Sequence, residues 1–227
     1  MKTVLLASAA ALALTVAGAS AKPMTPGAHS PAGHFVKRVL TQTPGSKTLY
    51  DQTGNDTGTG VVSDDFDSGS FDSYDDQGAD DFSVPSGHVW KVTEVDAPGV
   101  YFNGYGPADG VTVYFYKNKG GLPGKLKAKV TDGSVTDNNG SFAIKLPSAV
   151  KLKEGTYWVS VQAQMNFVGG EGEWGWETGS VQNGKPAAWQ NPGDGFATGC
   201  TSWGVLQSCL GYGPDLLFAL KGKDVTL

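Results

Sequence analysis

Short runs of alternating apolar and polar residues, separated by glycine-rich turns, constrain the fold of this chain most strongly. In the run Val111–Tyr116, the odd-numbered side chains would share one face of a strand and the even-numbered side chains the other. Residues 157–163 and 216–220 alternate in the same way. The turn signals between such runs lie at residues 120–124, 132–133, 138–140 and 153–155. Short strands at this spacing predict an all-β protein, an antiparallel β-sandwich of the jelly-roll type in a single domain.

The composition excludes several other classes of protein. The chain has 227 residues, which suits one domain, and its 33 glycines and 11% aromatic residues do not suit long helices or coiled coils. Only 17% of the residues are charged, and the formal net charge is -5. A negative net charge opposes binding to a nucleic-acid backbone or to an anionic membrane surface, so we expect neither as a partner.

The N-terminal segment is typical of a secretory signal peptide. Lys2 supplies a positive charge, residues 4–17 are apolar, and Ala19-Ser20-Ala21 has the small-x-small pattern of a cleavage site. An apolar run of about 14 residues is short for a membrane span, which needs about 20. We therefore expect residues 1–21 to be removed, the mature chain to begin at Lys22, and the product to be secreted without a membrane span.

The remaining chain divides by composition into three parts. Residues 22–48 are rich in proline and keep no apolar period, so we expect a flexible lead-in. The strand patterns and turn signals occupy residues 49–222, which we assign to the β-sandwich domain. Residues 223–227 are expected to form a short tail.

Both cysteines, Cys200 and Cys209, lie in the expected mature chain. An even number of cysteines in an oxidising compartment predicts a disulfide bond between them. Metal binding is the alternative, but two cysteines without a nearby histidine do not complete a tetrahedral site.

Three short motifs occur in a recognisable order. They are the GGLPG turn at 120–124, the GTYWVSV strand at 155–161 and the WGW segment at 174–176. In this order the chain resembles a group of bacterial extracellular β-sandwich domains, which occur alone in secreted proteins, beside secreted hydrolases, or ahead of C-terminal sorting anchors. The resemblance covers about residues 49–222 and implies the fold. It assigns no activity, and because residues 223–227 do not have the pattern of a sorting tail, we expect this chain to differ from the anchored members.

The tryptophans are the first candidates for ligand binding. Trp174 and Trp176 lie two residues apart on an expected strand, so their rings would face the same side about 6.6 Å apart. Such a pair suits stacking on a sugar chain, and Trp189 and Trp203 lie nearby in the sequence. The alternative is that these rings fill the sandwich, which is the role expected for Trp90 and Trp158.

Charge is distributed unevenly along the chain. Residues 50–81 contain many aspartates and no lysine or arginine, whereas eight lysines between Lys117 and Lys153 face only Asp132 and Asp137. Such segments complement each other within a domain or form solvated surface. The best acidic cluster, a candidate structural Ca²⁺ site with carboxylate ligands, consists of Asp75, Asp76, Asp80 and Asp81. Its spacing is not that of an EF-hand, so a solvated acidic loop is the alternative.

Glu171, Glu173 and Glu177 fall in one segment, and only Glu171 and Glu173 have a spacing that suits catalysis, since Glu173 and Glu177 would lie about 13 Å apart. On one strand face Glu171 and Glu173 would lie about 6.6 Å apart, within the roughly 5 to 9.5 Å between the two carboxylates of a glycosidase. Their spacing nevertheless resembles that of no jelly-roll glycosidase, and His88 is the sole histidine of the expected domain, which disfavours a catalytic triad.

The sequence favours a secreted, non-catalytic protein that binds carbohydrate or another extracellular surface polymer. A structural or interaction protein of the envelope or extracellular matrix, without a small-molecule site, is the alternative. A glycoside hydrolase using Glu171 and Glu173 is the third hypothesis. Exposure of Trp174 and Trp176 would favour binding, and burial of both rings would favour a structural role.

Overall fold

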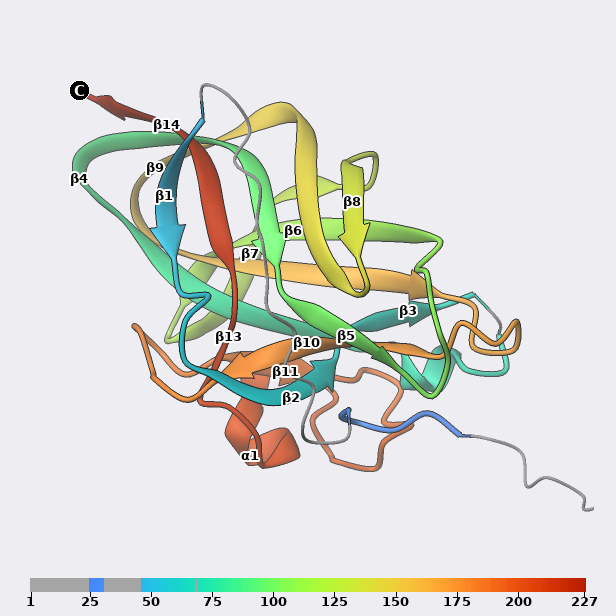
Figure 1. The fold of residues 1–227 in the computed structure, drawn as a ribbon. Helices are drawn as coiled ribbons and strands as arrows, with labels where there is room; N and C mark the ends of the chain where they lie inside the picture. The colour runs from blue at the N-terminus through green and yellow to red at the C-terminus, as the bar shows by residue number, and fades with distance from the viewer. Residues whose placement is uncertain (1–24, 31–45, 68) are drawn as a thin grey trace, which may run out of the picture.

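Figure 1 shows the computed structural model, which describes residues 25–30, 46–67 and 69–227. The expected signal peptide, residues 1–21, lies outside the described residues. Nearly all regular structure in the described part is β-strand, arranged in two sheets whose side chains share one hydrophobic core. This arrangement confirms the predicted all-β antiparallel sandwich.

The larger sheet has ten strands in the described residues. Its main path is β1 (Lys47–Asp51), β14 (Ala219–Thr226), β4 (Gln77–Ala97), β9 (Ser141–Met165), β6 (Gly110–Lys119) and β7 (Leu122–Val130). Off this path lie β3 (Asp64–Phe66), β8 (Ser134–Asn138), β11 (Ala188–Gln190) and β12 (Gly204–Val205). The short strand β3 pairs parallel with β9, whereas the pairs along the main path are antiparallel.

The smaller sheet has four strands centred on β10 (Glu173–Gly179). One edge of β10 pairs with β2 (Asp56–Val62), and the other pairs with β5 (Gly99–Phe102) and β13 (Asp215–Leu216). All seven residues of β10 are buried. A central strand that is covered on both faces need not alternate between apolar and polar residues.

The long strands β4 and β9 organise the larger sheet. They pair in three stretches, residues 80–84 with 155–159, residues 89–92 with 150–153 and residues 94–97 with 142–145, and the register shifts between successive stretches. Both strands curve strongly (Figure 1). The segment 153–155, expected to be a turn, therefore lies inside β9 at the first change of register.

Two other expected turns are tight hairpins. Gly120 and Gly121 join β6 to β7 with φ of 65° and 86°, and Asn139 and Gly140 join β8 to β9 with φ of 52° and 91°. Positive φ at both central residues is the geometry that matches the twist of a two-residue hairpin. Glycine and asparagine adopt it at the least steric cost, which explains these residues at the turns.

Aromatic rings from both sheets fill the core. Trp174 of β10 stacks on Phe142 of β9 with ring centroids 4.8 Å apart. Trp90 lies in the same core, and Trp158 is fully buried in a smaller cluster on the opposite face of the larger sheet. The expectation that Trp90 and Trp158 pack in the interior is therefore confirmed.

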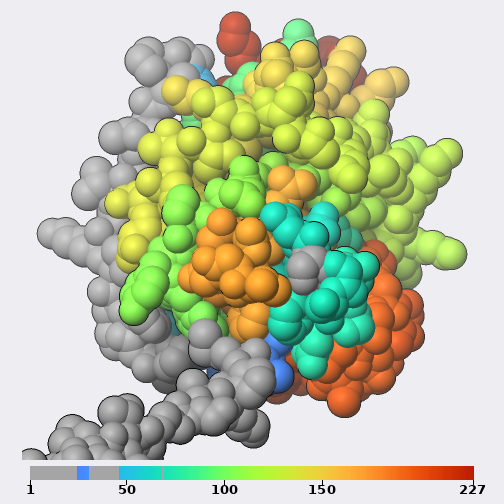
Figure 2. Space-filling model, turned by 90° about the vertical axis from the view of Figure 1, so that its right-hand side faces the viewer, coloured from blue at the N-terminus to red at the C-terminus, as the bar shows by residue number. Residues whose placement is uncertain are grey.

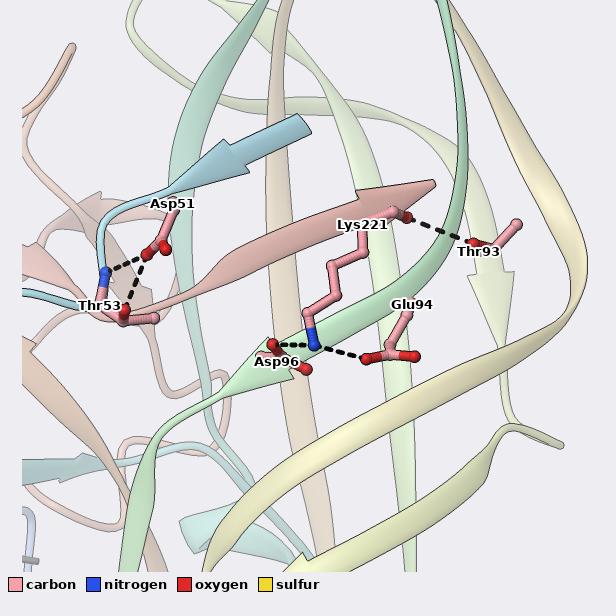
Figure 3. A network of polar contacts seen from close by, with 6 residues as sticks. All are labelled: Asp51, Thr53, Thr93, Glu94, Asp96 and Lys221. Carbon is pink, nitrogen blue, oxygen red and sulfur yellow. Dashed lines mark hydrogen bonds and ion pairs between the residues drawn. The ribbon is translucent and has the colours of Figure 1, made fainter. Parts of the chain in front are cut away.

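A buried ionic cluster joins β14 to β4 (Figure 3). The Lys221 ammonium lies 2.6 Å from Glu94 Oε1 and 2.6 Å from Asp96 Oδ2. All three side chains are almost completely buried. Burial raises the pKa of Asp96 to about 6, although the Lys221 ammonium opposes the rise. Such a cluster is tolerable in the interior because each charge has an opposite charge in contact.

The expected domain boundaries differ from the structure at both ends. Residues 25–30 belong to the expected flexible lead-in, yet Ser30 N–H donates to Gly60 O and Gly60 N–H donates to Ser30 Oγ, both at 2.8 Å. At the other end, β14 pairs with β4 as far as Thr226. Most of the expected tail 223–227 is therefore part of the larger sheet, because backbone pairing continues beyond the apolar run.

Short helical turns lie near one end of the molecule. The 3-10 turn η1 spans Asp72–Tyr74, and the five-residue helix α1 spans Leu206–Leu210. Figure 2 shows the segment around η1 beside the loop 166–172 and the segment that follows β11. Gly195 N–H donates to Ser73 O, and the rings of Phe71 and Phe167 are 5.0 Å apart, which fixes these neighbours. In the described part of the chain, no helix has the length and apolar character of a membrane span.

Candidate functional site

The structure contradicts the expected tryptophan platform. The side chains of Trp174, Trp176 and Trp189 have 0% exposure, so no ligand can stack on them in this fold. Trp174 and Trp176 do share one face of β10, with ring centroids 6.0 Å apart, but that face is the core of the sandwich. Among the four candidates, only Trp203 is half-buried and reaches the surface.

Hydrogen bonds explain why indole rings suit these interior positions. Trp174 Nε1 donates to Gly140 O at 2.6 Å, and Trp176 Nε1 donates to Leu217 O at 2.7 Å. Trp189 Nε1 donates both to Val62 O and to Asp76 Oδ1. Each buried N–H therefore has an acceptor, as buried tryptophan requires. These rings are structural.

The four aspartates proposed for Ca²⁺ do not form one site. Asp75 and Asp76 lie beside β3, where Asp75 Oδ1 accepts from Phe66 N–H. Asp80 Oδ2 instead accepts from Gln52 Nε2, and Asp81 Oδ1 accepts from Lys185 N–H. Among residues 25–30, 46–67 and 69–227, no group of three or more His, Cys, Asp or Glu side chains is placed to hold a metal ion. The four carboxylates do not converge on one point, because they accept N–H bonds from separate parts of the fold.

Buried carboxylates instead form a cluster around Asp64, Asp76 and Glu173. All three have at most 1% exposure. Burial raises the pKa of Asp64 well above its usual value, and the neighbouring Asp76 and Glu173 raise it further. Burial also raises the pKa of Asp76 strongly and that of Glu173 to about 8, against the opposing hydrogen bonds. These groups are therefore protonated at a pH where ordinary carboxyls are ionised.

The glycosidase hypothesis is not supported by the positions of Glu171 and Glu173. Glu173 is completely buried, and its carboxylate accepts from Gly27 N–H at 2.7 Å and from Asn103 Nδ2 at 2.6 Å. Glu171 is half-buried and its Oε2 accepts from Asn166 N–H within the loop before β10. A substrate cannot reach the buried carboxyl group of Glu173, and the Glu171 carboxylate is hydrogen-bonded to the backbone of its own loop. In this fold, Glu171 and Glu173 therefore cannot serve as the general acid and the second carboxylate of a glycosidase.

Three half-buried aromatic rings lie on and beside the outer face of β6. Tyr114 and Tyr116 alternate with the buried Val113 and Phe115, and their half-buried rings lie on the face away from the main core. The two ring centroids are 6.0 Å apart and the planes differ by 11°. The Trp203 ring meets Tyr116 edge-on at 5.7 Å. We call Tyr114, Tyr116 and Trp203 the aromatic strip.

Amide and hydroxyl groups accompany the aromatic strip. Tyr114 Oη donates to Gln162 Oε1 at 3.0 Å, and Tyr116 Oη donates to Gln77 Oε1 at 3.4 Å. Burial raises the pKa of Tyr116 to about 12 and also raises that of Tyr114, so both phenols keep their protons. The Lys129 ammonium lies 5.3 Å from the centre of the Tyr114 ring. Neutral phenols, amides and ring faces together are groups that can contact hydroxylated ligands.

The alternation in Val111–Tyr116 already placed Tyr114 and Tyr116 on the face opposite the core side chains. This signal could have identified the aromatic strip, but it is weaker than the WGW motif because tyrosines alternate in many ordinary strands. Trp203 was identified from the sequence. Its contact with Tyr116 was not, since the two residues are far apart in the chain and only the pairing of β11 with β4 and β12 brings them together.

The predicted disulfide between Cys200 and Cys209 is confirmed, with an S–S distance of 2.09 Å. The closed loop contains Trp203, β12 and most of α1.

We expect replacement of both cysteines with alanine to lower the free energy of unfolding by about 2.7 kcal/mol, the loop-entropy value for opening a ten-residue loop. The domain should stay folded because most of the core, apart from Leu206, lies outside this loop. Urea unfolding followed by circular dichroism measures the change, and an unchanged midpoint would refute the expectation.

Comparisons with known proteins give a likeness of fold. No family model matches the sequence, and no curated protein is similar to it. Among solved structures, the chain is similar to a surface layer associated protein of Clostridium difficile, in the crystal structure of its cysteine protease and lectin-like domains. The TM-score is 0.51 and the sequence identity 11%, over 84% of this chain and 38% of that chain. The chain thus spans well under half of the similar protein, and the likeness is one of fold alone.

Proposed function

We propose that this protein is a secreted, non-catalytic carbohydrate-binding protein that contacts a polysaccharide through Tyr114, Tyr116 and Trp203. The observation that carries the proposal is the aromatic strip on the outer face of β6, with two nearly parallel rings and amide groups beside them. Aromatic rings offer rigid apolar area for the faces of sugar rings, and the tyrosine hydroxyls can bond sugar hydroxyls. An open row of rings along a strand suits an extended polymer better than an enclosed monosaccharide.

Two further observations support the proposal. The disulfide fits an oxidising, extracellular compartment. The similar solved structure includes a lectin-like domain of a surface layer associated protein, which is compatible with a binding role at a cell surface. The burial of Trp174 and Trp176 favours the second candidate, a structural or interaction protein without a carbohydrate site.

Alanine substitutions in the aromatic strip test the proposal. We expect Tyr114→Ala and Trp203→Ala each to weaken binding to insoluble cellulose, chitin or xylan by about tenfold, because each removes one stacking ring worth roughly 1.4 kcal/mol. The measurement is a pull-down isotherm on the polysaccharide that the wild type binds. Urea unfolding of the same variants checks that they remain folded.

Tyr105 provides a matched control, since its ring is 94% exposed on a different loop. Tyr105→Ala should bind as the wild type does. Equal binding by wild type, Tyr114→Ala and Trp203→Ala would refute the aromatic strip as the site. No binding of the wild type to any polysaccharide of the panel would support the structural alternative instead.

A further inference from the structure

A second surface feature is positively charged, although the chain as a whole has a net charge of -5. A hollow of about 460 Å³ lies where β6, β7 and β9 meet. Its lining consists of Lys117, Lys125, Leu126, Lys127, Lys151, Lys153 and Tyr157. The five lysines are exposed, and within the described part of the chain none of them forms an ion pair. We call this the lysine hollow.

A row of lysines continues from the hollow across the larger sheet. Lys151 of β9 lies directly opposite Lys91 of β4, and Lys91 lies directly opposite Lys223 of β14. Residues directly opposite each other on antiparallel strands project from the same face, and neighbouring strands are about 4.8 Å apart. Three exposed lysines therefore arise from neighbouring strands at about that interval. Lys151 belongs to both the row and the hollow.

Like charges directly opposite each other destabilise a sheet, so this row opposes folding. The nearest acidic residues along the same strands do not neutralise it. Asp224, next to Lys223, accepts a hydrogen bond from Lys47 and contacts His88 Nδ1 at 2.9 Å. Glu154, next to Lys153, accepts from Ser86 Oγ and Gly87 N–H. In the described part of the chain no ion pair forms with Lys91, Lys151 or Lys223, although Asp132 lines a neighbouring hollow with Lys151. A negatively charged ligand would relieve the repulsion within the row.

We propose that the lysine hollow and the row Lys151, Lys91 and Lys223 bind an acidic polysaccharide that runs across the strands. A polymer with one carboxylate on every sugar presents regularly spaced negative charges, as the row presents positive ones. Lysine ammonium groups act as point charges that bind single carboxylates, and the hollow contains no arginine fork. The hollowed shape does not match a flat bilayer surface. Tyr157, the aromatic ring of the hollow, is only 7% exposed and offers no platform for a nucleobase.

This site is separate from the aromatic strip. None of the residues that line the hollow belongs to the aromatic strip, and Lys117 of the hollow alternates with Tyr116 along β6 and lies opposite Tyr157. The inference does not depend on the proposed function. Binding at the lysine site should persist in Tyr114→Ala, and binding at the aromatic strip should persist when the lysines are changed.

The test uses polygalacturonate, which has a carboxylate on every sugar, and hyaluronan of equal length, which has one on every second sugar. We expect the full chain to bind polygalacturonate more tightly than hyaluronan, and its affinity for both to fall as the salt concentration rises. Any binding to neutral dextran should be the same in the wild type and in the lysine variants. Lys91→Gln, Lys151→Gln and Lys223→Gln should each weaken polygalacturonate binding roughly fivefold at low salt. The matched control is Lys185→Gln, an exposed lysine outside the hollow, which should bind as the wild type does.

Each contrary outcome identifies what is wrong. If Lys125→Gln and Lys127→Gln weaken binding but Lys91→Gln and Lys223→Gln do not, the hollow alone binds and the row is refuted. Equal affinity for polygalacturonate and hyaluronan refutes the match of charge spacing. Tighter binding to single-stranded RNA than to polygalacturonate, or no binding to either polysaccharide, overturns the assignment of the ligand.

Discussion

Replacing Trp174 and Trp176 together with alanine is expected to prevent folding. Each ring is completely buried, and removing one buried tryptophan leaves a cavity that costs about 3 to 5 kcal/mol. Each substitution also leaves a buried carbonyl, Gly140 O or Leu217 O, without its indole donor. Two such losses amount to about 6 kcal/mol or more, which is comparable with the whole stability of a typical domain.

The single variants Trp174→Ala and Trp176→Ala are the measurable forms of this prediction. Urea unfolding should show a loss of about 3 kcal/mol or more for each. Trp176→Phe serves as a control that keeps most of the ring volume but removes the bond to Leu217 O, so its loss should be smaller. A loss below about 0.5 kcal/mol for either alanine variant, as expected at an exposed site, would contradict the burial of that ring.

Raising the pH from 5 to 8 is expected to destabilise the protein. Burial raises the pKa of Glu173 to about 8 and that of Asp215 to about 6, and it raises those of Asp64, Asp76 and Asp80 well above their usual values. In this pH range the folded protein retains protons that the unfolded chain has released. The stabilisation is therefore fully present below about pH 4, the pKa of these carboxyls in the unfolded chain. It is lost as the pH rises through their higher pKa values in the folded protein.

The size of this effect depends on how many groups stay protonated. Each carboxyl that is protonated when folded and ionised when unfolded contributes up to about 1.4 kcal/mol per pH unit. Melting temperatures or urea midpoints at pH 5, 6, 7 and 8 should thus fall steadily. Stability that stays constant or rises over this range would show that the buried carboxyls are ionised in the folded protein.

Glu173→Gln isolates one member of the cluster. Glutamine keeps the shape of the side chain, and the Asn103 amide can turn to accept from its NH₂ group, while Gly27 N–H donates to its carbonyl oxygen. The variant cannot ionise at this position, so its stability should fall less steeply between pH 5 and 8 than that of the wild type. An identical slope would mean that Glu173 does not contribute to the pH dependence.

Local pattern was sufficient for much of the architecture. Alternation in Val111–Tyr116 correctly separated the core side chains from those on the outer face, and glycine and asparagine at 120–121 and 139–140 marked two hairpins. These features depend on neighbours in the sequence, because side chains alternate by backbone geometry and positive φ is a property of single residues. The disulfide was also predictable, since two cysteines nine residues apart in an oxidising compartment have one partner each.

What covers each face of a strand was decided only by the tertiary structure. The sequence determined that Trp174 and Trp176 share a face, but β10 lies at the centre of its sheet and that face meets Phe142 from β9.

The surroundings of the acidic residues also depend on the tertiary structure. Asp76 and Asp80 are four residues apart, yet the fold buries Asp76 beside Asp64 and Glu173 and buries Asp80 against Gln52 and Leu216. The lysine row depends on the register of β9, β4 and β14, which pair residues far apart in the chain. Periodicity specifies which side chains point the same way, whereas burial and charge contacts depend on segments that only long-range pairing brings together.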